Sequence, residues 1–139
     1  MQSESNKAVI QLIVAGNYVV EKMNSFFKIY DLTIQQFNIL RILRGQDGLP
    51  INLNTLQSHM IHKMSNTTRL VDKLRKKGLV QRKECQENRR KIEIFITDKG
   101  LGLLAGIDHS LIKYEQKLTA NYNKEELSLL TSLLEKIKQ

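Results

Sequence analysis

The sequence predicts a mainly α-helical protein with one small β-hairpin, an α+β fold class. Two observations predict it. Apolar residues recur at helical spacing along most of the 139 residues, and the spacing changes to strand-like alternation only after Gly78. A chain of this length forms one domain, or one domain with appended helices, and buries about two-thirds of its unfolded surface.

The first element predicted is a helix over residues 5–30. Its apolar positions form a wide stripe: Val9, Leu12, Ile13, Val19, Val20, Met23, Phe26, Phe27 and Tyr30. Since a terminal helix this apolar has little to pack on within a small domain, we expect it to support a dimer.

The second helix has unusually complete start signals. Thr33 and Gln36 form a capping box, and Leu32 with Phe37 forms a hydrophobic staple. We expect the helix to end at Gly45, and Gln46 to Ile51 to be a loop that contains the single proline.

The next two helices form a helix-turn-helix pair. Asn54 is the predicted N-cap of the first, with Gln57 as its capping-box partner, and this helix runs to about His62. After a turn at 61–64, Ser65 is the predicted N-cap of the recognition helix. Gly78 ends that helix in a left-handed conformation, which lets Leu79 fold back onto Leu74.

The recognition helix has two distinct faces at about 100° per residue. The apolar side holds Thr67, Leu70, Val71 and Leu74. The other side holds donors, acceptors and cations that suit base edges and phosphates in a major groove: Ser65, Asn66, Thr68, Arg69, Asp72, Lys73 and Lys76.

Two short strands follow, at residues 79–83 and 91–96. Ile92, Ile94 and Ile96 share one face of the second strand. The polar segment 84–90 between them has no apolar anchor, so we expect it to project as a hairpin tip. A helix followed by such a hairpin is a winged helix-turn-helix.

The C-terminal part is predicted to be two helices. Thr97 caps the first, which carries Leu101, Leu104, Ile107, Leu111, Tyr114 and Leu118, although its three glycines weaken the early turns. Asn123 and Glu126 form a capping box for the second, a leucine-rich helix over about 124–137. We expect these helices and residues 5–31 to form a dimer base that carries two winged heads.

The positive charge is concentrated in the middle of the chain. Residues 69–91 hold ten Lys/Arg and three acids, which is +7 of the chain's net +8. A charge run is often only a solvated face. Here the cations converge on one helix face and the adjacent hairpin, which favours binding to nucleic acid, with an anionic membrane surface as the second alternative.

In these features the run from Leu32 to Gly100 resembles the MarR family of bacterial transcriptional regulators. The resemblance is carried by the segments 32–40 (LTIQQFNIL), 65–74 (SNTTRLVDKL), 76–82 (KKGLVQR), 88–91 (NRRK) and 96–100 (ITDKG), in that order and spacing. It implies a single domain over 1–139, with a winged helix-turn-helix at about 33–100 and dimerisation helices at about 5–31 and 101–139.

The predicted DNA-binding residues belong to the recognition helix and the wing. Arg69 is the preferred candidate for a base contact, because its guanidinium pairs with guanine. The resemblance implies that an arginine of the pair Arg89–Arg90 enters the minor groove, although Asn88 stands where the family usually has Asp. The full set is Ser65, Asn66, Thr68, Arg69, Lys73, Lys76, Arg82, Arg89, Arg90 and Lys91.

Other chemistries have weaker support. His59 and His62 have a spacing that suits two metal ligands, but ordinary surface histidines are favoured, so no metal or cofactor is expected. Cys85 lies among cations that favour a reactive thiolate, yet a bystander is favoured, because family members that sense oxidation use a cysteine near the N-terminal helices. No catalytic arrangement is present, so an enzyme is not expected.

We therefore expect a homodimeric regulator that binds double-stranded DNA at a pseudo-palindromic site. The resemblance implies a repressor that a small aromatic or phenolic ligand releases; Tyr30, Phe37 and Tyr114 either line a pocket for it or fill a core. The alternative is an interaction module whose basic face binds an acidic protein. The sequence shows no membrane span or export signal, and a single cysteine fits the cytoplasm.

Overall fold

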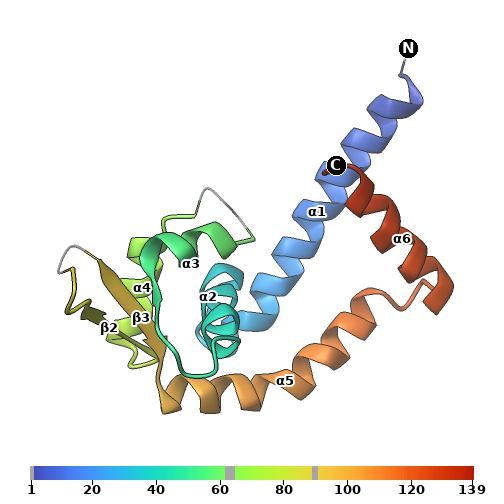
Figure 1. Ribbon diagram of the computed structural model, residues 1–139. Helices are drawn as coiled ribbons and strands as arrows, with labels where there is room; N and C mark the ends of the chain where they lie inside the picture. The colour runs from blue at the N-terminus through green and yellow to red at the C-terminus, as the bar shows by residue number, and fades with distance from the viewer. Residues whose placement is uncertain (1, 62–64, 89–90) are drawn as a thin grey trace. The chain divides into compact units, whose positions relative to one another are not determined.

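The computed structural model describes residues 2–61, 65–88 and 91–139. Their elements, labelled in Figure 1, are α1 (Glu4–Lys28), α2 (Ile34–Arg44), β1 (Ile51–Asn52), α3 (Leu53–His59), α4 (Thr67–Lys76), β2 (Val80–Glu84), β3 (Ile92–Ile96), α5 (Asp98–Leu118) and α6 (Lys124–Lys136). The chain divides into two compact units, Met1–Ile107 and Asp108–Gln139, with the boundary inside α5.

The first unit contains a winged helix-turn-helix head. Helices α2, α3 and α4 pack against one another and against the sheet, as Figure 1 shows. Its fully buried side chains come from every one of these elements and from the start of α5: Ile39, Leu40, Leu43, Leu56, Leu74, Val80, Ile94, Leu104 and Ile107. The predicted fold class, mainly helical with a small β wing, is confirmed.

The sheet has three antiparallel strands in the order β1-β3-β2. The hairpin β2–β3 was predicted, with Val80 opposite Ile96 and Arg82 opposite Ile94. The third strand was not, because Ile51 belonged to a predicted loop; it pairs instead with Ile94, and Asn52 pairs with Glu93. A strand of two residues carries no alternation, so only its long-range pairing identifies it.

The junction between α1 and α2 agrees with the sequence prediction. Thr33 Oγ1 accepts a hydrogen bond from the Gln36 N–H at 3.1 Å, and Gln36 Oε1 accepts one from the Thr33 N–H at 3.0 Å. Asn24 Oδ1 on α1 accepts a bond from the Ile34 N–H at 2.8 Å, and the rings of Phe27 and Phe37 stack at 4.4 Å. The C-terminal turns of α1 are therefore anchored to the head.

The predicted cap of α3 is wrong. Asn52, not Asn54, is the N-cap, and its Oδ1 accepts from the Thr55 N–H at 2.7 Å. The helix ends at His59 rather than about His62, and Met60, in extended conformation, is buried. The two asparagines are equally good caps by type, and the pairing of residue 52 with β3 decides between them.

The start signals of α5 and α6 are confirmed. The Gly100 N–H donates to Thr97 Oγ1 at 3.1 Å, and Asn123 and Glu126 form the predicted capping box. In the second unit, Asp108–Gln139, α6 has no buried residue. Its leucines at 129, 130, 133 and 134 are exposed in this single chain.

Candidate nucleic-acid interface

The recognition helix α4 begins one residue later than predicted. Asn66 is the N-cap, and its Oδ1 accepts from the Arg69 N–H at 3.2 Å. The predicted cap, Ser65, is instead buried, and among the described residues its hydroxyl has no hydrogen-bond partner. Ser65 therefore does not share the exposed surface of the contacts predicted on α4.

Local contacts fix the start of α4 against α3. The Thr67 hydroxyl at the first position of α4 donates to Gln57 Oε1 on α3. Thr67, Val71 and Leu74 are the buried residues of α4, as its predicted apolar face requires, whereas Leu70 is half-buried. This packing leaves one side of the helix for an external partner.

The end of α4 is held in a Schellman motif. Gly78 has a φ of +77°, its N–H donates to Arg75 O at 2.9 Å, and the Leu79 N–H donates to Leu74 O at 3.0 Å. Lys99 Nζ donates to Lys77 O at 2.8 Å and the Thr97 hydroxyl to Gly78 O at 2.7 Å. The predicted glycine stop is confirmed, and α5 supplies additional caps.

The exposed side of α4 carries most of the predicted contact residues. Asn66, Thr68, Arg69, Lys73 and Lys76 are all exposed. The Asn66 side-chain oxygen caps the helix, so its amide NH₂ is the group left to donate to an external partner. These side chains offer hydrogen-bond donors and positive charge in one row, the combination that suits bases and phosphates.

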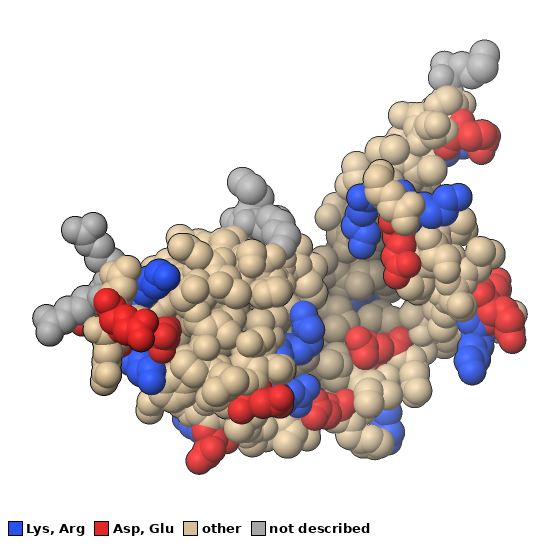
Figure 2. All heavy atoms as spheres, in the orientation of Figure 1, with Lys and Arg blue, Asp and Glu red and all other residues tan. Residues whose placement is uncertain are grey.

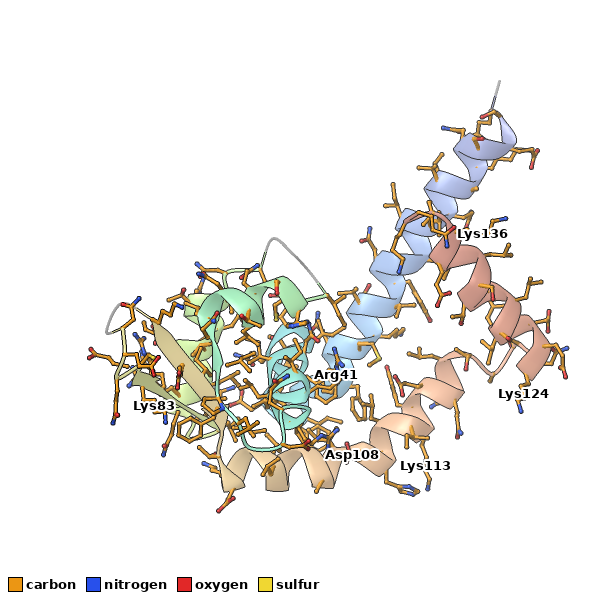
Figure 3. All side chains as sticks on the ribbon, in the orientation of Figure 1. Arg41, Lys83, Asp108, Lys113, Lys124 and Lys136 are labelled. Carbon is orange, nitrogen blue, oxygen red and sulfur yellow. The ribbon has the colours of Figure 1, made fainter. Side chains whose placement is uncertain are left out.

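The wing lies directly after this helix. Beyond Val80, the residues of β2 are exposed, and the Cys85 N–H donates to Lys91 O at 3.0 Å where the ladder ends. Lys83 lies on the wing, as Figure 3 shows, with its Nζ 6.0 Å from the centre of the Phe95 ring. Lys91 is exposed, while Arg89 and Arg90 lie outside the described residues.

The charge of the wing is mixed on one face. Figure 2 shows acidic side chains beside the blue ones over the wing strands. Lys83 is opposite Glu93 in the strand register. The excess of cations in residues 69–91 therefore does not come from this face of the wing alone. Helix α4 contributes much of it.

Sequence reasoning missed an ion-pair cluster between α4 and the wing. Asp72 Oδ1 lies 3.4 Å from the Arg82 guanidinium on β2 and 3.8 Å from that of Arg75, one turn along α4. The i,i+3 spacing of Asp72 and Arg75 could have indicated the second pair. The first depends on the tertiary arrangement of helix and strand.

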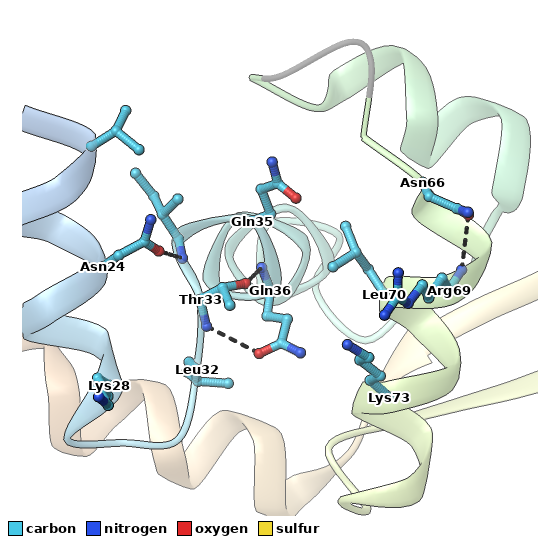
Figure 4. Close-up of a pocket in the computed structure, with 12 residues that line it drawn as sticks. Asn24, Lys28, Leu32, Thr33, Gln35, Gln36, Asn66, Arg69, Leu70 and Lys73 are labelled. Carbon is cyan, nitrogen blue, oxygen red and sulfur yellow. Dashed lines mark hydrogen bonds between the residues drawn. The ribbon is translucent and has the colours of Figure 1, made fainter. Parts of the chain in front are cut away.

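A groove separates α4 from the α1–α2 junction (Figure 4). It has a volume of about 560 Å³, and Arg69, Leu70 and Lys73 face Asn24, Lys28 and the start of α2 across it. A neighbouring hollow of about 520 Å³ adds Asp31, Lys76 and Lys77. Lys77 Nζ lies 3.4 Å from Asp31 Oδ2 and donates to Asp31 O, which connects α4 to the junction.

Two of the three aromatic residues named as possible pocket lining have other surroundings. Phe37 is buried and stacks on Phe27, and the Tyr30 ring lies 5.6 Å from that of Phe26. Neither lines the groove. Phe37 therefore belongs to the packing of α1 on α2, and Tyr30 packs on the last turns of α1.

Two further observations concern other kinds of site. Across the described ranges, no three His, Cys, Asp or Glu side chains gather closely enough to bind a metal ion; His62 lies outside those ranges. No helix in the described part of the chain has the length and apolar character needed to cross a membrane.

Comparisons with known proteins agree with this geometry. A sequence model of the MarR family matches residues 32–92. The HTH-type transcriptional regulator SarZ of Staphylococcus haemolyticus is 29% identical over 99 residues, which are 71% of this chain and 66%, just under two thirds, of SarZ. MhqR of Bacillus subtilis, also an HTH-type transcriptional regulator, is 27% identical over 137 residues, covering 99% of this chain and 93% of its own.

A solved structure matches nearly the whole chain. A mutant of MarR from E. coli, solved in complex with operator DNA, has a TM-score of 0.81 and 25% identity. The match covers 98% of this chain and 99% of that one. The likeness therefore extends beyond the winged head to the flanking helices.

Proposed function

We propose that this chain, which belongs to the MarR family of transcriptional regulators through its winged helix-turn-helix at residues 32–92, acts as a homodimeric repressor on a pseudo-palindromic operator. It is a DNA-binding regulator rather than an enzyme. The observation that carries the proposal is the exposed polar side of α4 beside the wing. On it, Arg69, Lys73 and Lys76 are exposed while the opposite side is buried in the head.

The proposed contacts divide into two kinds. Arg69, with Asn66 and Thr68 beside it at the N-terminal end of α4, contacts base edges or nearby phosphates. Lys73 and Lys76, further along the helix, neutralise the backbone. The wing adds phosphate contacts by Arg82 and Lys91 and a minor-groove contact by Arg89 or Arg90.

The dimer is proposed from exposed apolar surface. Most of α1 is exposed before Met23, and its large apolar side chains there include Ile13 at 58% and Val14 at 56% exposure. Four leucines of α6, at 129, 130, 133 and 134, are exposed as well. Monomeric proteins rarely leave such continuous apolar surface in water, so a second copy of the chain is the natural cover.

This division gives each part of the chain a role. Residues 33–100 form the DNA-binding part, and the helices at about 5–31 and 101–139 form the dimer base, so that 1–139 acts as a single MarR-like domain. A two-fold axis then places two recognition helices about 34 Å apart, one turn of B-DNA. The protein acts on DNA in the cytoplasm.

The groove beside α4 is the proposed place for a releasing ligand. Arg69 and Lys73 line it and also belong to the proposed DNA contacts. A small aromatic or phenolic molecule bound there need only favour a head position that no longer matches the grooves of the operator. The support is that residues of the groove lining are also proposed DNA contacts.

The alternative function is an interaction module whose basic face binds an acidic protein. Both functions require surface cations, but only an operator-binding dimer distinguishes one duplex sequence from another. The test is to enrich duplexes from a randomised pool with the full chain, and then to measure affinity for an enriched duplex and its scrambled version across a salt series.

An operator-binding dimer should prefer the enriched duplex by about 1,000-fold or more. For binding to B-DNA, log K should fall with log salt at a slope of about −0.9 per phosphate neutralised. Equal, weak binding to both duplexes would contradict the proposal and favour the interaction module.

A further inference from the structure

We propose that Asp72 is a positioning residue for DNA recognition: it orients Arg82 of the wing against the recognition helix and reduces binding to non-operator DNA. The inference rests on the proposed function. It concerns an acidic side chain that sequence reasoning placed on the DNA-facing side of α4 without giving it a role.

The geometry places Arg82 between the helix and the sheet. Arg82 is opposite Ile94 in the antiparallel register, and directly opposite residues share one face of a sheet. Ile94 is fully buried, so Arg82 starts from the face that packs on the head. Its side chain lines a narrow cleft together with Thr68 and Val71 of α4.

Asp72 then determines where the guanidinium of Arg82 lies. Its Oδ1 is 3.4 Å from the guanidinium nitrogen, and the side chains of Asp72 and Arg82 are 41% and 36% exposed. A long arginine side chain at the rim of a sheet has many rotamers, and a fixed carboxylate selects those that point toward α4. The wing strand and the recognition helix thereby present their cations as one surface.

The charge of Asp72 has a second consequence. Asp72 is the only acid in residues 69–83, a segment with seven Lys/Arg. Thr68 and Lys76, four residues before and after it, are exposed and among the proposed contacts, so Asp72 lies within that surface. A carboxylate there opposes close approach of any phosphate. Its ion pairs with Arg75 and Arg82 persist only when the DNA backbone lies where it does not disrupt them.

Asp72 should therefore affect the ratio of the affinities for the enriched and scrambled duplexes more than it affects either affinity alone. Asp72→Asn removes the charge and keeps the shape. We expect affinity for the scrambled duplex to rise about threefold because one repulsive charge is lost. Affinity for the enriched duplex should fall about threefold, because the lost orientation of Arg82 outweighs that gain. The ratio of the two affinities should fall about tenfold.

A double-mutant cycle isolates the pair. If Asp72 acts through Arg82, Asp72→Asn should leave the ratio unchanged in an Arg82→Ala background. Glu87→Gln is the matched control, because it removes the same charge from the basic run of residues 69–91, at the wing tip. It should raise both affinities and preserve the ratio. Arg82→Gln, which keeps Asp72, should lower the ratio as Asp72→Asn does. It replaces Asp72→Asn as the test if the Asp72→Asn variant does not fold.

Each result bears on the inference. An unchanged ratio in Asp72→Asn, an equal fall in the Arg82→Ala background, or an equal fall in Glu87→Gln would overturn it while leaving the proposed function in place. If the wild-type chain itself shows no preference for the enriched duplex, the proposed function fails and the inference fails with it. The thermal unfolding temperature of each variant distinguishes positioning from a purely structural role. A purely structural role would lower the unfolding temperature and both affinities together.

Discussion

Arg69 lies where two surfaces of the head meet. Its N–H is bound by the Asn66 cap, which fixes the first turn of α4, while its side chain is exposed and lines the groove toward α2. A guanidinium on a rigid first turn loses little freedom on binding, so it is well suited to a bidentate contact with one base. The same position also brings it within reach of a ligand in the groove.

We predict that Arg69→Ala weakens binding to the enriched duplex by about 1–3 kcal/mol and relaxes the preference at one base pair in each half-site. The measurement is a titration against duplexes that carry every substitution at each position. Lys124→Ala, which removes the same charge from the start of α6, is the control and should have little effect. Uniform weakening across all the duplexes would instead identify Arg69 as a phosphate contact.

At the level of elements, the end of α4 and the start of α5 support each other. Gly100 lies so close to Leu79 O that an added Cβ would overlap with it, and that Cβ would be 2.6 Å from Ile96 Cγ1. Gly102, two residues later in the same helix, has nothing within 4 Å of such an atom. The close approach at Gly100 lets Thr97 and Lys99 reach the carbonyls at the end of α4.

We predict that Gly100→Ala lowers the free energy of unfolding by about 1–3 kcal/mol, because a backbone oxygen and a buried isoleucine must move. Gly102→Ala should raise it by about 0.5–1 kcal/mol, since alanine is the better helix former. Urea unfolding of both variants gives the two values. Equal effects of the two substitutions would contradict the close packing at Gly100.

For the molecule as a whole, the proposed dimer relates the exposed helices to the DNA-binding heads. The anchored turns of α1 contain the buried Met23, Phe26 and Phe27, whereas the turns before them have no buried residue. A helix that is anchored at one end and exposed at the other is suited to form the proposed dimer interface. Two heads joined in this way can contact two half-sites at once.

We predict that Ile13→Asp shifts the chain from dimer to monomer at micromolar concentration, because a charge is placed within the apolar surface of α1. Sedimentation equilibrium measures the shift. Affinity for the enriched duplex should fall by about 100-fold, since the second half-site no longer binds intramolecularly. Gln11→Asp adds a charge to the same helix and serves as control; a dimer that survives Ile13→Asp would place the interface elsewhere.

Much of the fold and part of the site could be predicted from single segments. The capping boxes at Thr33 and Asn123 and the stop at Gly78 depend on residues no more than about five apart, which is the range in which sequence patterns are informative. The N-caps of α3 and α4 could not be chosen between neighbouring polar residues. Ser65 and Asn54 are suitable by type, and the positions taken by Ile51 and Thr67 in the core select Asn52 and Asn66.

Local patterns along the chain were enough to establish the helical periods, the polar side of α4, the concentration of charge at 69–91 and the resemblance that these support. The folded arrangement was needed to establish that Ile51 pairs with Ile94, that Asp72 holds Arg82, that Lys77 reaches Asp31 and that a groove opens beside Arg69. The difference comes from separation along the chain. Interactions within a turn follow from neighbouring residues, whereas a contact between distant residues depends on how every intervening element packs.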